Sequence, residues 1–188
     1  MRTLTIALVH HPVVDAAGAV VTTAITNLDV HDLARTARTY GCGRYFLVHP
    51  IQAQRDLVAR IREHWLTGSS GRRIPSRKEA LALVEVAVSL EDVYASLGGR
   101  DAIEVWVTAA RDLGDGAMST SDAREALEGE GKPVLLLFGT GWGLDRSVLL
   151  AADRRLAPVR AAAPGATYNH LSVRGACAII LDRLLGDR

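Results

Sequence analysis

The chain alternates short apolar runs with longer segments of helical periodicity, and this alternation limits the folds open to it. The apolar runs, rich in valine, isoleucine and leucine, cover residues 4–9, 45–48, 83–88, 103–107 and 134–138. The helical patterns cover residues 30–40, 52–66, 90–97, 119–128, 145–153 and the apolar stripe within 168–185. Because neighbouring parallel strands need crossover connections, the pattern predicts an α/β fold with a mostly parallel sheet and helices on both faces.

The size and composition predict one soluble domain spanning residues 1–188. The 48% hydrophobic and 23% charged residues are ordinary for a globular protein. No apolar run approaches the roughly 20 residues of a membrane helix, and the first residues resemble a strand more than a secretory signal. Cys42 and Cys177 lack metal-binding spacing, which favours a reduced, cytoplasmic setting.

The charge distribution singles out one local cluster. A formal net charge of +1 gives no overall sign of a nucleic-acid partner. The segment RRIPSRK at 72–78 concentrates positive charge directly after the glycine- and serine-rich GSSG. It is either a solvated surface loop or a loop that contacts phosphates, and the sequence favours neither.

A glycine-rich segment, VLLLFGTGWGL at 134–144, ends the fifth predicted strand. A phosphate loop would need a lysine after the last glycine, Gly143, and none follows it. The dinucleotide fingerprint would need a sixth-position glycine counted from Gly139, where Leu144 stands. The segment therefore indicates either a loop that approaches a ligand without a pyrophosphate or a tight turn between strand and helix.

Three loops follow the carboxyl ends of predicted strands and share a small-residue composition. They are TAARDLGDGAMS at 108–119, GTGWGL at 139–144 and LAPVRAAAPGATYNHLS at 156–172. Ligands of open α/β sheets bind at these strand ends, so the three loops predict a compact pocket. Asn169 or Ser172 is expected to cap the last helix and to add hydrogen-bonding groups at its positive end.

Other catalytic arrangements have weaker support. The G-x-S-x-G pattern of serine hydrolases is absent from the sequence. His10, His11 and Asp15 form a possible metal corner, but no third ligand shares an element with the histidines, so no metal is predicted.

A second polar group, His31 with Asp29 and Asp32, starts the first predicted helix. It fits an acid–base cluster or a helix cap. The cap is favoured, because a short carboxylate accepts amide hydrogen bonds at a helix start.

Three segments, taken in order, resemble the motifs of the SPOUT class of RNA methyltransferases. DVHDLARTARTYG at 29–41 carries Arg35 six positions before Gly41, the spacing of the first motif. LFGTGWGL at 137–144 resembles the second motif, and LAPVRAAAPGATYNHLSVRGACAIIL at 156–181 resembles the third. The resemblance spans essentially the whole chain and is closest to a small bacterial RNA-methyltransferase-like group.

This resemblance implies a C-terminal trefoil knot, S-adenosylmethionine as cofactor, and a homodimer that methylates RNA. By matching position, it implies that the cofactor is bound by Thr108, Phe138, Gly139, Thr140, Gly141, Leu156, Pro158, Tyr168, Asn169, Leu171 and Ser172. The RNA substrate, tRNA or rRNA, and the methylated position, a base or the ribose 2′-OH, stay open.

The resemblance also assigns residues to the RNA. Arg35 is expected to be catalytic, facing an RNA phosphate or the reacting group; as a single residue it equally suits a solvent-exposed helix position. RNA contacts are expected from Arg38, Arg72, Arg73, Arg77 and Lys78. Such charges position a backbone without reading its sequence.

Two departures from the family pattern bear on the reaction. Ribose-methylating members carry a glutamate where Gly141 stands, and guanine-N1-methylating members carry a catalytic aspartate for which Asp112 and Asp115 are the nearby candidates. Two alternatives therefore stay beside the enzyme: a protein that binds S-adenosylmethionine without transferring the methyl group, and an unrelated α/β nucleotide-binding enzyme.

Overall fold

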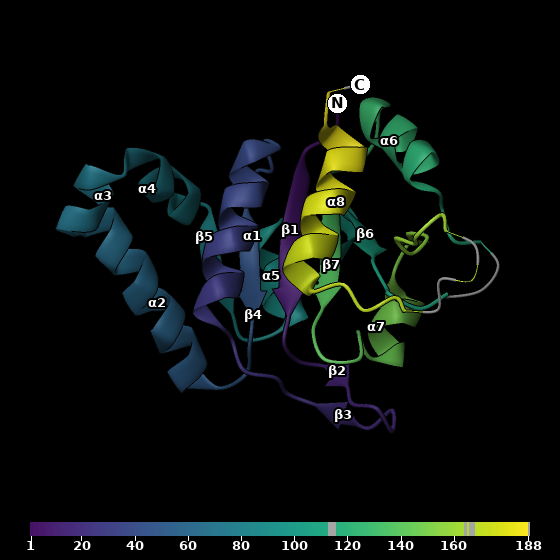
Figure 1. The fold of residues 1–188 in the computed structure, drawn as a ribbon, viewed down its shortest axis with the longest axis horizontal. Helices are drawn as coiled ribbons and strands as arrows, with labels where there is room; N and C mark the ends of the chain where they lie inside the picture. Colours follow the sequence, from purple (N-terminus) through teal and green to yellow (C-terminus); the bar gives the residue numbers. More distant parts are fainter. Residues whose placement is uncertain (113–115, 164, 166–167, 188) are drawn as a thin grey trace.

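The computed structural model describes residues 1–112, 116–163, 165 and 168–187. Within them a six-stranded, fully parallel sheet has the order β5-β4-β1-β7-β6-β8 (Figure 1). Its strands are β1 (Leu4–Val9), β4 (Tyr45–Val48), β5 (Val84–Ala87), β6 (Glu104–Val107), β7 (Val134–Gly139) and β8 (Arg154–Arg155). The five predicted strands and their parallel arrangement are confirmed. A small antiparallel hairpin of β2 (Val13–Val14) and β3 (Val20–Val21) was not predicted.

Helices cover both faces of the sheet, as predicted. On one face pack α1 (Asn27–Thr39), α2 (Gln52–Thr67), α4 (Pro75–Ala82), α6 (Thr120–Glu128) and α8 (Val173–Leu185). On the other face pack α5 (Leu90–Ser96) and α7 (Arg146–Ala151), with the 3₁₀ turn η1 (Arg100–Ala102) nearby. Successive residues of β1 alternate between the two cores: Ile6 and Leu8 face the first group, and Ala7 and Val9 the second. Every residue of β1 is buried, as expected for a central parallel strand.

The register of the central strands brings their carboxyl ends to one edge. Val9 of β1 pairs with Val48 of β4 on one side and with Gly139 of β7 on the other. The residues that directly follow these three strands, His10, His49 and Thr140, therefore meet at this edge. The candidate site is built there.

The start of α1 differs from the prediction that Asp29 or Asp32 caps it. Thr26 is the capping residue: its hydroxyl accepts a hydrogen bond from the Asp29 backbone N–H at 3.2 Å. The Asp29 carboxylate accepts the Thr26 backbone N–H at 3.3 Å, which completes a capping box. The prediction was wrong by one turn, because Asp29 is the third helical residue and Asp32 lies in the next turn.

Removing this cap should destabilise the protein modestly. We expect Thr26→Ala to lower the free energy of unfolding by about 1 kcal/mol, since an amide of the first turn loses its acceptor. Urea denaturation measures the change. Thr39→Ala, at the exposed far end of the same helix, is the control and should change stability by less than about 0.5 kcal/mol. Equal effects of the two substitutions would contradict the capping role.

The basic segment 72–78 was predicted as a loop, and this was wrong. Arg72 and Arg73 complete the short helix α3 (Ser69–Arg73), and α4 begins at Pro75 and contains Arg77 and Lys78. The physical reason is the proline, whose fixed φ and missing N–H suit the first position of a helix. The basic side chains are thereby held on helices beside α2.

The C-terminal helix α8 follows the prediction. Ser172 caps it, accepting the Gly175 backbone N–H at 3.1 Å, and the apolar stripe including Cys177 and Leu181 is buried. Arg174 ties the helix to α1 through an ion pair with Asp32 at 3.2 Å. No helix among the described residues is long and apolar enough to cross a membrane.

Both cysteines lie in the core that α1 and α8 cover. Cys42 and Cys177 are buried and form no disulfide, in agreement with the prediction of reduced, packed thiols. Burial raises the pKa of the Cys42 thiol to about 12. Burial also raises the pKa of Cys177. Neither thiol is therefore a nucleophile at neutral pH.

Candidate active site

The loops that follow β6, β7 and β8 meet at one edge of the sheet (Figure 1). The Asn169 side-chain amide donates to the Ala110 carbonyl at 2.7 Å, which joins the loop after β8 to the loop after β6. Leu156 pairs with Met118 as an isolated parallel bridge between the same two loops. The rings of Trp142 and His170 approach to 6.0 Å, so the glycine-rich loop also contacts the loop after β8.

The hairpin β2–β3 holds the glycine-rich loop from its other side. The Trp142 backbone N–H donates to the Val14 carbonyl, and the Val14 N–H donates to the Gly143 carbonyl, both at 2.9 Å. A Cβ on Gly139 would lie 2.7 Å from the Leu144 nitrogen, and one on Gly141, whose φ is 59°, would lie 3.1 Å from the Val14 oxygen. These two glycines therefore let the loop fold on itself and against the hairpin.

Gly143 is the glycine of this loop with open space. Its φ is 112°, and no described atom lies within 4 Å of the place where a Cβ would stand. A left-handed backbone with an uncovered Cα suits the close approach of a small ligand. The loop thus has room beside Gly143 for the small ligand that the resemblance implies.

Two threonine hydroxyls predicted to bind the cofactor already form hydrogen bonds within the protein. The Thr108 hydroxyl donates to the Leu137 carbonyl at 3.0 Å, and the Thr140 hydroxyl donates to the Val9 carbonyl at 3.1 Å. Their roles at the edge are therefore to hold the loop backbones in place.

The other predicted cofactor residues divide by exposure. Phe138 and Leu156 are buried beneath the loops, and Pro158 is half-buried. Tyr168 is 79% exposed and Leu171 47% exposed. Phe138 and Leu156 therefore pack beneath the loops at this edge, and Tyr168 and Leu171 expose apolar surface beside them.

Two histidines stand behind the glycine-rich loop: His10, which was considered only for a metal site, and His49, which sequence reasoning missed. The Nδ1 of His10 hydrogen bonds the Thr23 hydroxyl at 3.0 Å, and that hydroxyl hydrogen bonds the hydroxyl of Thr140. The Nε2–H of His49 donates to the Thr23 carbonyl at 2.9 Å, and its Nδ1 accepts the Ile51 N–H at 3.1 Å. These contacts connect the ends of β1 and β4 to the loop after β7. Their sequence signal was the position of both histidines directly after buried strands.

Neither histidine titrates normally. Burial, followed by the neighbouring His49, lowers the pKa of His10 to about 4. Burial is also the largest cause of the lowered pKa of His49. Both rings are therefore neutral near pH 7. Among the described residues no cluster of three or more His, Cys, Asp or Glu side chains is arranged to hold a metal ion.

The aspartates considered for catalysis lie in or next to the loop after β6. The Asp112 carboxylate forms an ion pair with Arg160 at 3.0 Å, a third link to the loop after β8. Asp115 lies outside the described residues. Asp15, considered for metal binding, instead forms the turn of the hairpin, accepting the Ala17 and Ala19 backbone N–H groups at 2.8 and 2.9 Å.

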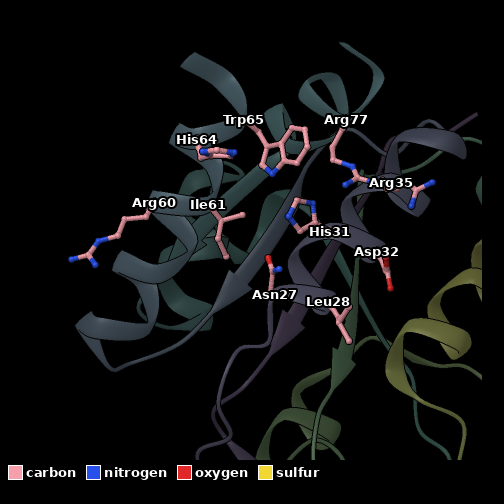
Figure 2. A pocket seen from close by; sticks show the side chains of 10 residues that line it. All are labelled: Asn27, Leu28, His31, Asp32, Arg35, Arg60, Ile61, His64, Trp65 and Arg77. Carbon is pink, nitrogen blue, oxygen red and sulfur yellow. The ribbon is translucent and has the colours of Figure 1, made fainter. Parts of the chain in front are cut away.

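Arg35 lies away from the three loops, in a groove of about 630 Å³ between α1, α2 and α4 (Figure 2). It is eight residues along α1 from Asn27, or about 12 Å toward the opposite edge of the sheet. Arg77 of α4 lines the same groove, as do Trp65 and Arg60 of α2. The structure thus brings the predicted catalytic arginine together with one predicted RNA-binding residue.

The remaining predicted RNA-binding residues surround this groove without lining it. Arg38 forms an exposed ion pair with Glu79 at 3.5 Å. Arg72, Arg73 and Lys78 are exposed on α3 and α4. Sequence reasoning missed Trp65 and Arg60, whose signal was a mixed aromatic and basic face on α2.

Comparison with known proteins identifies the family. A family model described as SAM-dependent RNA methyltransferase matches residues 3–186. The chain belongs to this family. The match confirms the predicted class of enzyme and its cofactor, S-adenosylmethionine.

The curated relatives of the chain differ from it in length. It is 41% and 40% identical to proteins of Oleidesulfovibrio alaskensis and Nitratidesulfovibrio vulgaris, both named tRNA (guanine-N(1)-)-methyltransferase. The alignments cover 99% of this chain and 43% of each relative, so the chain spans less than half of those proteins. It is 37% identical to an uncharacterized protein of Aquifex aeolicus, over 95% of this chain and 86% of that one.

Solved structures of methyltransferases share the fold at low sequence identity. A probable methyltransferase of Bordetella pertussis superposes with a TM-score of 0.64 at 18% identity, covering 97% of this chain and 94% of the other. A TrmH/SpoU tRNA modifying enzyme of A. aeolicus superposes with a TM-score of 0.60 at 13% identity, over 98% and 75%. At such identities the likeness concerns the fold alone, and it agrees with the resemblance to the SPOUT class.

Proposed function

We propose that this RNA methyltransferase acts on tRNA. The observation that carries the proposal is the family match over residues 3–186, which coincides with an edge where three loops converge around an uncovered glycine backbone. The names of the two desulfovibrio relatives support tRNA over rRNA as the substrate class. They also make N1 of guanine the first atom to test. Because those relatives are more than twice as long, their activity comes to this chain only as a proposal.

Bound S-adenosylmethionine supplies a methyl group activated by a sulfonium. The contribution of this chain is positional: the loops after β6, β7 and β8 hold the cofactor, and the protein aligns the accepting atom with the methyl carbon. The neutral network of His10, Thr23 and Thr140 fixes the glycine-rich loop from behind. Asp112 lies in the loop after β6, which is one of the three loops of the cofactor edge. It is therefore the first carboxylate to test as the group that removes a proton from the accepting nucleotide.

We propose a homodimer, in which Arg35 serves the active site of the second copy. Arg35 lies on the groove side of α1, about 12 Å along the helix from the strand ends. Within one chain it does not stand beside the three loops that hold the cofactor. The exposed apolar side chains Trp142, Tyr168 and Leu171 lie on those loops and give a second copy a surface to cover.

Three further features belong to the same proposal. The likeness to SpoU-type structures supports a trefoil knot in the C-terminal segment, in which the loop after β8 leads into α8. The two hydrophobic cores pack on opposite faces of the same sheet, which supports a single methyltransferase domain over residues 1–188. The reduced cysteines and the tRNA substrate support a cytoplasmic location.

The decisive experiment has two stages. Calorimetric titration with S-adenosylmethionine should give saturable binding. Transfer of a labelled methyl group should then be measured with tRNA and rRNA from a strain that lacks this enzyme, followed by identification of the labelled nucleotide. Absence of binding at high micromolar cofactor would contradict the proposal. Binding without transfer to any RNA would instead favour the non-catalytic binding protein. Gly141, which stands where ribose-methylating members carry a glutamate, supports that alternative.

Replacing Arg35 should separate transfer from cofactor binding. We expect Arg35→Ala to leave the affinity for S-adenosylmethionine unchanged and to lower kcat/KM for RNA by at least about tenfold, or about 1.4 kcal/mol. Arg62→Ala removes the same charge from an exposed position of α2 and is the matched control. Loss of cofactor binding in a folded Arg35→Ala protein would show that its assigned role is wrong.

A further inference from the structure

The groove between α1, α2 and α4 has an excess of unneutralised positive charge. Arg35, Arg60 and Arg77 line it, and none of the three forms a salt bridge within the described part of the chain. Its acidic lining residue, Asp32, is paired with Arg174 at 3.2 Å. Three arginines without carboxylate partners in one concave site favour an anionic ligand.

The wall of the groove is aromatic and apolar, which a phosphate alone does not require. The guanidinium of Arg77 lies 5.0 Å from the centre of the Trp65 ring. The rings of His31 and His64 meet Trp65 edge-on, at 5.6 and 5.7 Å (Figure 2). Leu28, which is 54% exposed, adds aliphatic surface at the mouth. Aromatic and arginine surfaces together are typical of sites for unstacked RNA bases.

The contact with Trp65 also prepares Arg77 for an anion. A guanidinium stacked on an aromatic ring keeps its N–H groups at its edge, where they remain available as donors. Stacking restricts the side chain before any ligand arrives, so less conformational entropy is lost on binding. Arg77 is therefore the best prepared of the three arginines for a phosphate.

His31 adds a neutral polar group to the wall. Burial, followed by the charge of Arg77, lowers the pKa of His31, so its ring is uncharged near neutral pH. Its Nδ1 is buried and has no hydrogen-bond partner within the described part of the chain. The ring therefore adds a polar group to the wall without adding to its charge.

We propose that this groove binds one unpaired nucleotide of the RNA substrate, with the base against the wall formed by Trp65 and the phosphate between Arg60 and Arg77. The proposal rests on the proposed function for the identity of the polyanion as RNA. The volume, about 630 Å³, suits one flipped or single-stranded nucleotide. A double helix presents stacked bases that this wall does not reach. Within one chain the groove is thus an RNA-holding site separate from the cofactor edge.

Binding of fluorescein-labelled oligoribonucleotides tests the groove without any methyl transfer. The probes are single-stranded hexamers of adenosine and of uridine and a matched RNA duplex, followed by fluorescence anisotropy over a range of salt concentrations. We expect the wild-type protein to prefer the single strands. Arg60→Ala and Arg77→Met should each raise Kd about five- to tenfold and reduce the slope of log K against log salt by about 0.7. Trp65→Leu should raise Kd about tenfold or more.

Matched variants separate this site from general attraction to a basic surface. Arg62→Ala removes one charge two residues from Arg60, outside the groove, and should change Kd less than twofold. Trp65→Phe keeps an aromatic ring and should retain most of the affinity lost in Trp65→Leu, while circular dichroism verifies the fold of each variant. Equal effects of Arg60→Ala and Arg62→Ala, or unchanged hexamer binding by folded Trp65→Leu, would overturn the proposal.

Titration of the same variants with S-adenosylmethionine keeps the two proposals distinct. Groove variants should bind the cofactor like the wild-type protein. Cofactor binding and methyl transfer that persist in all variants, with unchanged hexamer affinity, would refute the groove alone. A wild-type protein that binds hexamers through the groove but does not bind S-adenosylmethionine would refute the proposed function alone.

Discussion

Replacement of Gly139 by valine is expected to abolish measurable binding of S-adenosylmethionine. A Cβ at this position would lie 2.7 Å from the Leu144 backbone nitrogen and 3.0 Å from the Gly143 carbonyl carbon. The contacts are with backbone of the same loop, so the loop must open to make room. A displacement of about 1 Å in a positioning element costs about 100-fold in reaction rate, and we expect a loss of cofactor affinity of similar order.

Calorimetry and thermal unfolding together measure this effect. Overpacking costs about 1–3 kcal/mol, so the valine variant should stay folded with a lower midpoint of unfolding. Gly129→Ala is the control for loss of a glycine, since its Cβ would meet ordinary contacts at 3.6 Å and it lies outside the glycine-rich loop. Cofactor affinity within threefold of wild type for Gly139→Val would mean that the loop is not part of the cofactor site.

Lowering the pH from 6.5 to 4 is expected to destabilise the protein through His10. Its pKa is lowered to about 4 by burial, whereas in the unfolded chain it returns to its ordinary value of 6.5. Between these values the unfolded state binds a proton that the folded state excludes, so stability falls as pH falls. The full contribution is about 3 kcal/mol, present above pH 6.5 and lost by pH 4.

The slope of stability against pH identifies this contribution. Urea unfolding between pH 7.5 and 4 should give a flatter curve for His10→Asn than for wild type, whatever the substitution costs at pH 7.5. Part of the slope should remain, because burial also lowers the pKa of His49 and of His31. Parallel curves for wild type and His10→Asn would show that His10 is not the group that becomes protonated on unfolding.

The sheet was predictable because its strands are continuous apolar runs. Each predicted strand lies within a residue of its observed bounds, since apolar residues dominate each run and the central strands β1, β4 and β7 are buried on both faces. The hairpin β2–β3 was not predicted because each of its strands has two residues, too few to show an alternating apolar pattern. The helices at 69–82 were not predicted because the glycines and serines at 68–71 have low helix propensity, and only the position of Pro75 marked a helix start.

The candidate sites were predictable in part, and the limit is geometric. The convergence of three loops followed from the common edge of parallel strands, so their meeting was foreseen. The partners of the glycine-rich loop were not, because Val14 and Thr23 reach it from a hairpin that the sequence did not reveal. The groove brings together Arg35, Trp65 and Arg77 from three separate helices. The sequence alone does not show how these helices pack against one another, so the groove could not be predicted.

The strand order has a consequence for synthesis of the protein on the ribosome. The first strand, β1, lies between β4 and β7, and Leu4 pairs with Val134, 130 positions later in the chain. One edge of β1 therefore stays without its final partner until β7, 130 positions later, has been made. An uncovered apolar strand edge is a template for pairing with other chains. We expect the nascent N-terminal half to depend on chaperones until β7 emerges.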